Sequence, residues 1–90
     1  MNKVVVERYH ASFCQPCKVV APVINELKNE FMPKGVVFKD VDIEDDYQLT
    51  EQRKVMSVPT VIIVRNGSEF GRITGVNPKN VFSDAIQSAL

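Results

Sequence analysis

Hydrophobic residues along the first half of the chain follow a strand pattern and then a helix pattern. The run from Val4 to Tyr9 is rich in β-branched residues and predicts a buried strand. From Gln15 to about Phe31 the apolar residues recur at three- and four-residue spacing, which predicts an amphipathic helix. Its predicted apolar face consists of Val19, Val20, Val23, Ile24, Leu27 and Phe31. Pro33 and Gly35 are expected to end this helix.

A second strand and a short helix are predicted next. Residues 36–43 contain two runs rich in β-branched residues, Val36-Val37-Phe38 and Val41-Asp42-Ile43, and these runs predict a strand. A strand, a helix and a second strand joined by a crossover of this length predict a right-handed parallel unit. Asp45 or Asp46 can cap a short helix that runs to about Lys54.

The last third of the chain predicts a hairpin and a final helix. Residues 61–64 and 70–73 are apolar runs separated by Asn66-Gly67, whose tolerance of positive φ suits a tight turn between antiparallel strands. Asn77 followed by Pro78 is typical of a cap and a first helical turn. The apolar face predicted for this helix contains Val81, Phe82, Ala85, Ile86 and Ala89. The element order is β-α-β-α-β-β-α, an α/β fold.

Length and charge limit the organisation and the partners. The chain has 90 residues, so residues 1–90 are expected to form one domain. The chain has 11 lysine and arginine residues and 11 aspartate and glutamate residues, so its formal net charge is zero. A chain without net positive charge is not drawn as a whole to nucleic acid or to an anionic membrane. Residues 1–10 mix charged and apolar groups and show neither a signal peptide nor a membrane span. We therefore expect a cytoplasmic protein without nucleic-acid or membrane partners.

Two cysteines three positions apart carry the candidate chemistry. Cys14 lies at the start of the predicted helix, where unpaired amides and the helix dipole lower a thiol pKa from about 8.5. Cys14 is the predicted nucleophile. Cys17, one helical turn later, is the predicted resolving thiol. Gln15 and Pro16 lie between them and are expected to tune the redox poise, because Pro16 has no amide to donate.

An inert cysteine pair and a zinc site both receive less support. Inert core cysteines have no need for a strand-to-helix junction, where redox pairs are found. A zinc site normally needs four ligands, whereas His10 is the only histidine available to join the two cysteines. No metal is therefore expected.

Several further motifs occur in the order in which they occur in thioredoxins, and the chain resembles that family over nearly its whole length. The motifs are Phe13-Cys14-Gln15-Pro16-Cys17-Lys18, Pro22, Val58-Pro59-Thr60, Asn66-Gly67 and Gly75. The resemblance implies a thioredoxin-like, four-stranded mixed sheet in the order second-first-third-fourth, with helices on both faces. It also implies that the chain is a shortened thioredoxin without the family's first strand and helix.

The resemblance further implies a substrate groove beside the cysteines. Pro59 is then cis, Val58 offers its backbone to an extended substrate, and Phe13 supplies an apolar rim in place of the usual tryptophan. Gly75 is either a point of close approach for the substrate backbone or only a turn at the end of a strand.

The activity implied by the resemblance is that of a thiol–disulfide oxidoreductase that reduces disulfide-containing proteins. A thioredoxin-reductase-like flavoprotein or another dithiol donor would recharge it, no bound cofactor is needed, and a monomer is expected. A glutaredoxin-like enzyme dependent on glutathione is a rival interpretation, although no Gly-Gly pair occurs near Gly75. A partner-binding subunit without redox turnover is a second rival, and an enzyme of oxidative folding in an export compartment is a third.

Some residues differ from the family pattern. Gln15 replaces a glycine, and Arg8 replaces a buried aspartate that assists the resolving cysteine. Asp40 lies where bacterial members often have lysine, so Arg8 and Asp40 are expected either to pair behind Cys17 or to leave Arg8 extending to solvent. Strand alternation places Glu7 on the face opposite Arg8. His10 is either a proton relay or a structural surface residue.

Overall fold

The apolar runs form four strands of one mixed sheet. In the computed structural model, which describes residues 2–90, the strands are β1 (Val4–His10), β2 (Val37–Asp42), β3 (Thr60–Arg65) and β4 (Ser68–Thr74). Their order across the sheet is β2-β1-β3-β4. β1 and β2 are parallel, while β3 is antiparallel to both β1 and β4. The predicted topology is confirmed.

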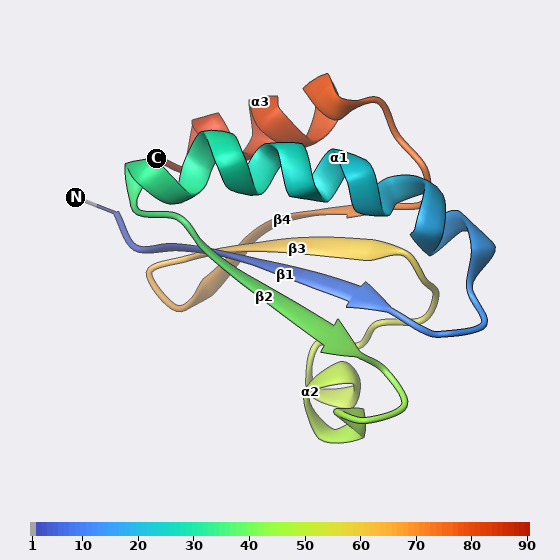
Figure 1. Cartoon of the computed structure of the whole chain (residues 1–90). Coiled ribbons are helices and arrows are strands. Elements are labelled where there is room, and N and C mark those ends of the chain that lie inside the picture. The colour runs from blue at the N-terminus through green and yellow to red at the C-terminus, as the bar shows by residue number, and fades with distance from the viewer. Residues whose placement is uncertain (1) are drawn as a thin grey trace.

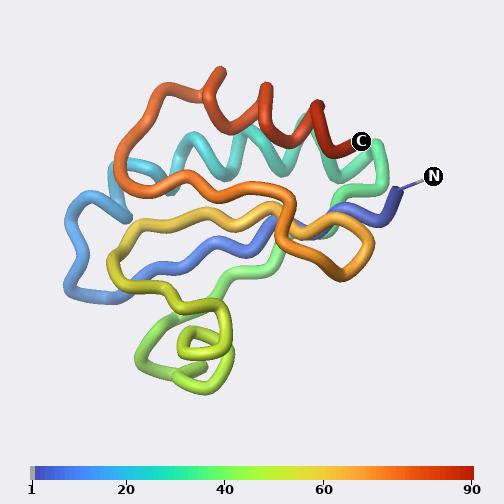
Figure 2. Tube along the Cα trace, turned by 180° about the vertical axis from the view of Figure 1, so that it is seen from behind, coloured from blue at the N-terminus to red at the C-terminus, as the bar shows by residue number. Residues whose placement is uncertain are grey.

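Helices cover both faces of this sheet. They are α1 (Gln15–Phe31), the 3-10 turn η1 (Met32–Lys34), α2 (Tyr47–Gln52) and α3 (Lys79–Ala89). α1 and α3 lie on one face, and the short helix α2 lies alone on the other (Figures 1 and 2). No helix in the described part of the chain combines the length and the apolar character needed to cross a membrane.

The core is divided by the sheet into two layers. Val4 and Val6 of β1 pack with the buried faces of α1 and α3, whereas Tyr9 packs on the α2 side with Val41 and Ile62. Side chains alternate along a strand. Arg8 therefore faces α1, and Glu7 faces α2, as predicted.

One position on the predicted apolar face of α1 is wrong. The buried residues of α1 are Cys17, Val20, Ile24, Leu27 and Phe31. Val19 is instead 60% exposed. Successive helical residues are rotated by about 100°, so Val19 lies to one side of the buried stripe that Val20 and Ile24 define.

Turn chemistry agrees with the prediction at the hairpin and at α2. Asn66 and Gly67 both have positive φ, and Arg65 pairs with Ser68 across this two-residue turn. The carboxylate of Asp46 accepts a hydrogen bond from the amide of Leu49 at 3.1 Å and caps α2.

The predicted cap of the last helix is wrong by one residue. Pro78, in an extended conformation, is the N-cap of α3 and makes no side-chain cap bond. The side-chain amide of Asn77 instead donates to the carbonyl oxygens of Thr74 and Gly75. Asn77 therefore closes the turn that follows β4 rather than beginning the helix.

Candidate active site

Cys14 and Cys17 form a disulfide at the beginning of α1. Cys14 is the N-cap residue with an extended backbone, and the two Cα atoms are 5.3 Å apart. Cys14 is 5% exposed and Cys17 is 2% exposed. The pair lies where β1 ends and α1 starts, so strand and helix together hold the sulfur atoms at the carboxyl end of this interior strand.

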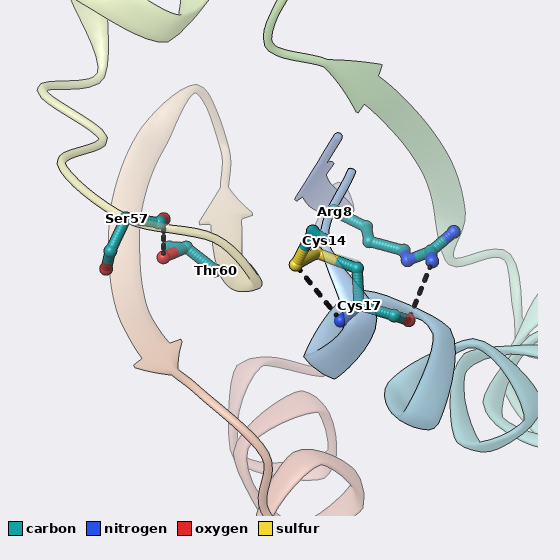
Figure 3. Close-up of a disulfide and its surroundings, with 5 residues drawn as sticks. All are labelled: Arg8, Cys14, Cys17, Ser57 and Thr60. Atoms are coloured by element: carbon teal, nitrogen blue, oxygen red, sulfur yellow. Dashed lines mark hydrogen bonds between the residues drawn. A yellow bond between two sulfur atoms is a disulfide. The ribbon is translucent and has the colours of Figure 1, made fainter. Parts of the chain in front are cut away.

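The first turn of α1 directs a backbone amide at the sulfur atom of Cys14. The backbone N–H of Cys17 donates to Sγ of Cys14 at 3.1 Å (Figure 3). A helix N-terminus carries unpaired amides and a partial positive charge, both of which favour an anion. Gln15 and Pro16 are exposed, and Pro16 has no amide to contribute. The site is therefore arranged to stabilise a thiolate at Cys14.

A second segment, residues 55–58, reaches the disulfide from the other side; we name it the groove loop. Val58 packs against the cluster formed by Ala11, Cys14 and Cys17. The Val58–Pro59 peptide bond is cis, as the resemblance implies. The Thr60 hydroxyl donates to the carbonyl oxygen of Ser57 at 2.8 Å, which ties the loop to the start of β3 (Figure 3).

Gly75 and Phe13 flank this arrangement. The Gly75 amide donates to the carbonyl oxygen of Pro59 at 2.8 Å. Gly75 has a φ of +86°, which side chains rarely adopt, and apart from its chain neighbours no described residue lies within 4 Å of where a Cβ would be. Phe13 precedes Cys14 and is 70% exposed. The fold thus brings Cys14, Cys17, Val58, Pro59 and Gly75 together, with Phe13 projecting beside them.

Arg8 lies behind Cys17. Its Nη2 donates to the carbonyl oxygen of Cys17 at 3.3 Å, and its Nη1 lies 3.7 Å from Oδ1 of Asp40 (Figure 3 shows the first contact). Arg8 and Asp40 are also register partners on β1 and β2. Lys28 of α1 contacts the same carboxylate at 3.2 Å. The side chain of Arg8 is only 14% exposed, so the paired arrangement holds rather than the extended one.

One atom of Arg8 makes no bond to the described residues. Nε is buried and lacks a hydrogen-bond partner among residues 2–90. The charge of Arg8 is thus only partly compensated. Nη1 lies near the half-exposed carboxylate of Asp40, Nη2 donates to the Cys17 carbonyl oxygen, and Nε has no partner among residues 2–90. Positive charge therefore remains next to Cys17.

On the opposite face of the sheet lies a buried carboxylate whose partners the sequence did not reveal. Glu7 is 5% exposed and accepts hydrogen bonds from the Tyr9 hydroxyl at 2.8 Å and from Nε and Nη2 of Arg53 at 3.0 and 3.1 Å. β1 is predicted as a buried strand, so a charged residue within it is a signal that a partner exists. Arg53 is 46 positions away, and no local pattern identifies it.

The Tyr9 hydroxyl, which donates to Glu7, is expected to make the stability of the protein depend on pH. Burial raises the pKa of Tyr9, and the hydrogen bond to Glu7 raises it further. A raised pKa in the folded state contributes stability below the unfolded pKa of about 10, and that stability is lost as the pH rises above it. We expect the urea midpoint of the oxidised protein to fall above about pH 10, and to fall less for Tyr9→Phe. If the urea midpoint fell equally steeply with pH for the unaltered protein and for Tyr9→Phe, Tyr9 would not be the group responsible.

The remaining candidate residues add no metal site. Among residues 2–90, no group of three or more His, Cys, Asp or Glu side chains is placed to hold a metal ion. His10 ends β1 and is partly buried. Its role as a proton relay stays a prediction.

Comparison with known proteins identifies the family. The sequence model described as Thioredoxin matches residues 1–88. Thioredoxin of Staphylococcus saprophyticus is 30% identical over 82 residues, covering 91% of this chain and 78% of that protein. The chloroplastic M-type thioredoxin of Spinacia oleracea is 35% identical over 82 residues, covering 91% and 45%. The structure of Fasciola hepatica thioredoxin has a TM-score of 0.89 at 25% identity, covering 98% of this chain and 82% of that chain.

The site agrees with this match, because the two cysteines of the C-x-x-C motif form a disulfide at a helix start. The chain therefore belongs to the thioredoxin family of thiol–disulfide oxidoreductases.

Proposed function

We propose that this protein reduces disulfide bonds of other proteins, with Cys14 as the attacking thiol and Cys17 as the resolving thiol. The observation that carries the proposal is the N–H of Cys17 directed at Sγ of Cys14, in a disulfide that lies at the start of α1 beside a cis-proline loop. The same amide can stabilise a thiolate on Cys14 once the disulfide is reduced.

The reaction consists of two thiol–disulfide exchanges. The Cys14 thiolate attacks one sulfur of the substrate disulfide, forms a mixed disulfide and releases the first substrate thiolate. The Cys17 thiolate then attacks Sγ of Cys14, restores the Cys14–Cys17 disulfide and releases the second substrate thiolate. Two electrons pass to the substrate, and the two cysteines are oxidised.

A protein substrate is expected to bind along the groove loop. Val58 packs against the cysteines, and by the resemblance to thioredoxins its backbone would pair with an extended substrate strand. The open side of Gly75 leaves room for a passing backbone. Phe13 adds an exposed apolar contact at the rim.

The oxidised protein requires an external source of two electrons. We propose a dithiol donor, for which a thioredoxin-reductase-like flavoprotein is the expected physiological form. The chemistry of the cycle takes place on the protein's own sulfur atoms.

A turnover assay tests the proposed function. We expect the protein to accelerate reduction of insulin disulfides by dithiothreitol, and glutathione as the sole reductant to support little turnover. Rapid turnover with glutathione alone would indicate a glutaredoxin-like enzyme. Failure to accelerate insulin reduction, despite a reducible Cys14–Cys17 bond, would contradict the proposed activity.

Arg8 is proposed to tune the redox poise. Its guanidinium binds the Cys17 carbonyl and is only partly compensated by Asp40. A positive charge at this place favours the thiolate, and stabilising the reduced form makes the couple more oxidising. We expect Arg8→Met to lower the reduction potential by about 30 mV, which corresponds to a tenfold change in the exchange equilibrium.

Asp40→Asn should shift the potential in the opposite direction, because it removes the charge that partly neutralises Arg8. Arg65→Met is a matched control: Arg65 pairs with Val4 at the far end of β1 from the cysteines. Equilibration with glutathione buffers measures all three. An unchanged potential in both Arg8→Met and Asp40→Asn would exclude the tuning role.

A further inference from the structure

The end of α2 is held over the sheet by side chains from two strands. Glu7 pairs with Ile62 across β1 and β3, and Ile62 pairs with Arg72 across β3 and β4. These three residues therefore form one row on the face that α2 covers. Arg53, the C-cap residue of α2, contacts both ends of this row.

The contacts attach α2 at two points. The Arg53 side chain makes two hydrogen bonds to the carboxylate of Glu7. Nη2 of Arg72 donates to the carbonyl oxygen of Arg53 at 2.8 Å, and Nη1 donates to that of Lys54 at 3.4 Å. Both carboxylate oxygens of Glu69 accept from Arg72, at 2.6 and 2.7 Å, which orients its guanidinium. We call Glu7, Arg53, Arg72 and Glu69 the α2 clamp.

The α2 clamp acts where the chain turns toward the active site. Lys54 has a φ of +54°, the left-handed conformation that ends helices and that residues with a side chain rarely adopt. The groove loop begins at the next residue and leads to the cis bond before Pro59. A cation at the carbonyl end of a helix is favourable. Here the Arg72 guanidinium binds the carbonyl oxygens of two successive residues, Arg53 and Lys54.

We infer that Arg72 and Glu69 are positioning residues for protein substrates, which act by fixing the direction in which the groove loop leaves α2. This inference rests on the proposed function, because it assigns the groove loop to substrate binding. The far end of the loop is tied by Thr60 to Ser57. Arg72 ties the near end, so the backbone that meets an extended substrate is held between two anchors.

The variant Arg72→Met tests the inference, since Arg72 lies on β4 and its side chain is one-third exposed. We expect kcat/KM for insulin to fall about fivefold to tenfold, mainly through KM, as for one lost hydrogen bond. The reduction potential and the rate with a small aromatic disulfide should not change. Amide exchange of Lys54 and Val55, whose N–H groups donate to the carbonyl oxygens of Glu51 and Thr50, should become faster. Arg72→Lys should restore part of the insulin KM.

Arg65→Met is the matched control, because Arg65 lies over the ring of Phe70 and makes no hydrogen bond or ion pair to α2 or the groove loop among residues 2–90. A KM for insulin in Arg72→Met equal to that of Arg65→Met would overturn the inference. An equal loss with the small disulfide would also overturn it. If Arg72→Met fails to fold, Glu69→Gln replaces it, because this variant removes the carboxylate that orients the Arg72 guanidinium. A KM for insulin in Glu69→Gln equal to that of Arg65→Met would then overturn the inference. Failure of the unaltered protein to reduce insulin would contradict the proposed function instead.

Discussion

Replacing Cys14 with serine is expected to slow insulin reduction by more than about a thousandfold, because a serine hydroxyl is a far weaker nucleophile than a thiolate at neutral pH. Cys17→Ser has a different expected outcome. This variant retains the attacking thiol at Cys14. Each variant molecule forms one mixed disulfide with a substrate molecule, and the reaction stops there because no second thiol releases the substrate. Intact-mass measurement after mixing with an oxidised protein substrate should show this adduct for Cys17→Ser.

The two roles follow from the position of each cysteine in α1. Cys14 is the N-cap residue and accepts the amide of Cys17, whereas Cys17 is almost fully buried one turn later. Ser12→Ala is a suitable control, since Ser12 is exposed and its hydroxyl donates to Glu44 at the surface. A stable adduct with Cys14→Ser, and none with Cys17→Ser, would reverse the assignment.

The cysteine variants also test the glutaredoxin-like and the partner-binding interpretations. Continued turnover of Cys17→Ser with glutathione would indicate a monothiol mechanism of the glutaredoxin kind. A double Cys14→Ser, Cys17→Ser variant that retained its biological function would indicate a partner-binding subunit that does not need redox turnover.

The second large effect is expected for stability. Glu7→Leu should lower the free energy of unfolding by about 2–4 kcal/mol, somewhat less than the usual cost of breaking a fully buried ion pair, because the Arg53 side chain left behind is 29% exposed. The variant leaves the hydroxyl of Tyr9 buried without its acceptor and Arg53 without its counter-charge. Such a loss is a large fraction of the total stability of a typical domain, about 5–15 kcal/mol. Urea unfolding of the oxidised protein measures it.

Two further variants show whether the burial of Glu7 causes the effect. Glu69→Gln breaks an ion pair whose partners are 38% and 32% exposed, and it should cost less than about 1 kcal/mol. The triple variant Glu7→Leu, Tyr9→Phe, Arg53→Met removes all three polar groups and should recover much of the lost stability. A Glu7→Leu protein as stable as Glu69→Gln would show that the buried network contributes little.

Local patterns in the sequence were enough to predict the helices and strands and to identify Cys14 and Cys17 as a redox pair. The β-branched run of β1, the helical spacing after Cys14 and the Asn66-Gly67 turn each report a conformation that neighbouring residues determine. The order of the strands followed from the crossover rule and from the resemblance to thioredoxins. These expectations required no knowledge of distant contacts.

The errors occurred where a position depends on what packs against it. Val19 is apolar and has helical spacing, but no element covers its side of α1 and it stays exposed. Asn77 has the composition of a cap, yet its amide finds better acceptors in the carbonyl groups of Thr74 and Gly75. In both cases tertiary surroundings overrode a correct local preference.

For the Cys14–Cys17 pair, the sequence alone determined the reaction type, because the spacing of the two thiols and the helix start are local properties. Only the tertiary structure decided what surrounds them. The register of β1 and β2 sets Arg8 against Asp40, and the fold brings Arg53 at the end of α2 into contact with Glu7 and Arg72 of the sheet. Charges far apart in the chain interact according to their distance and burial after folding, and no local pattern encodes either quantity.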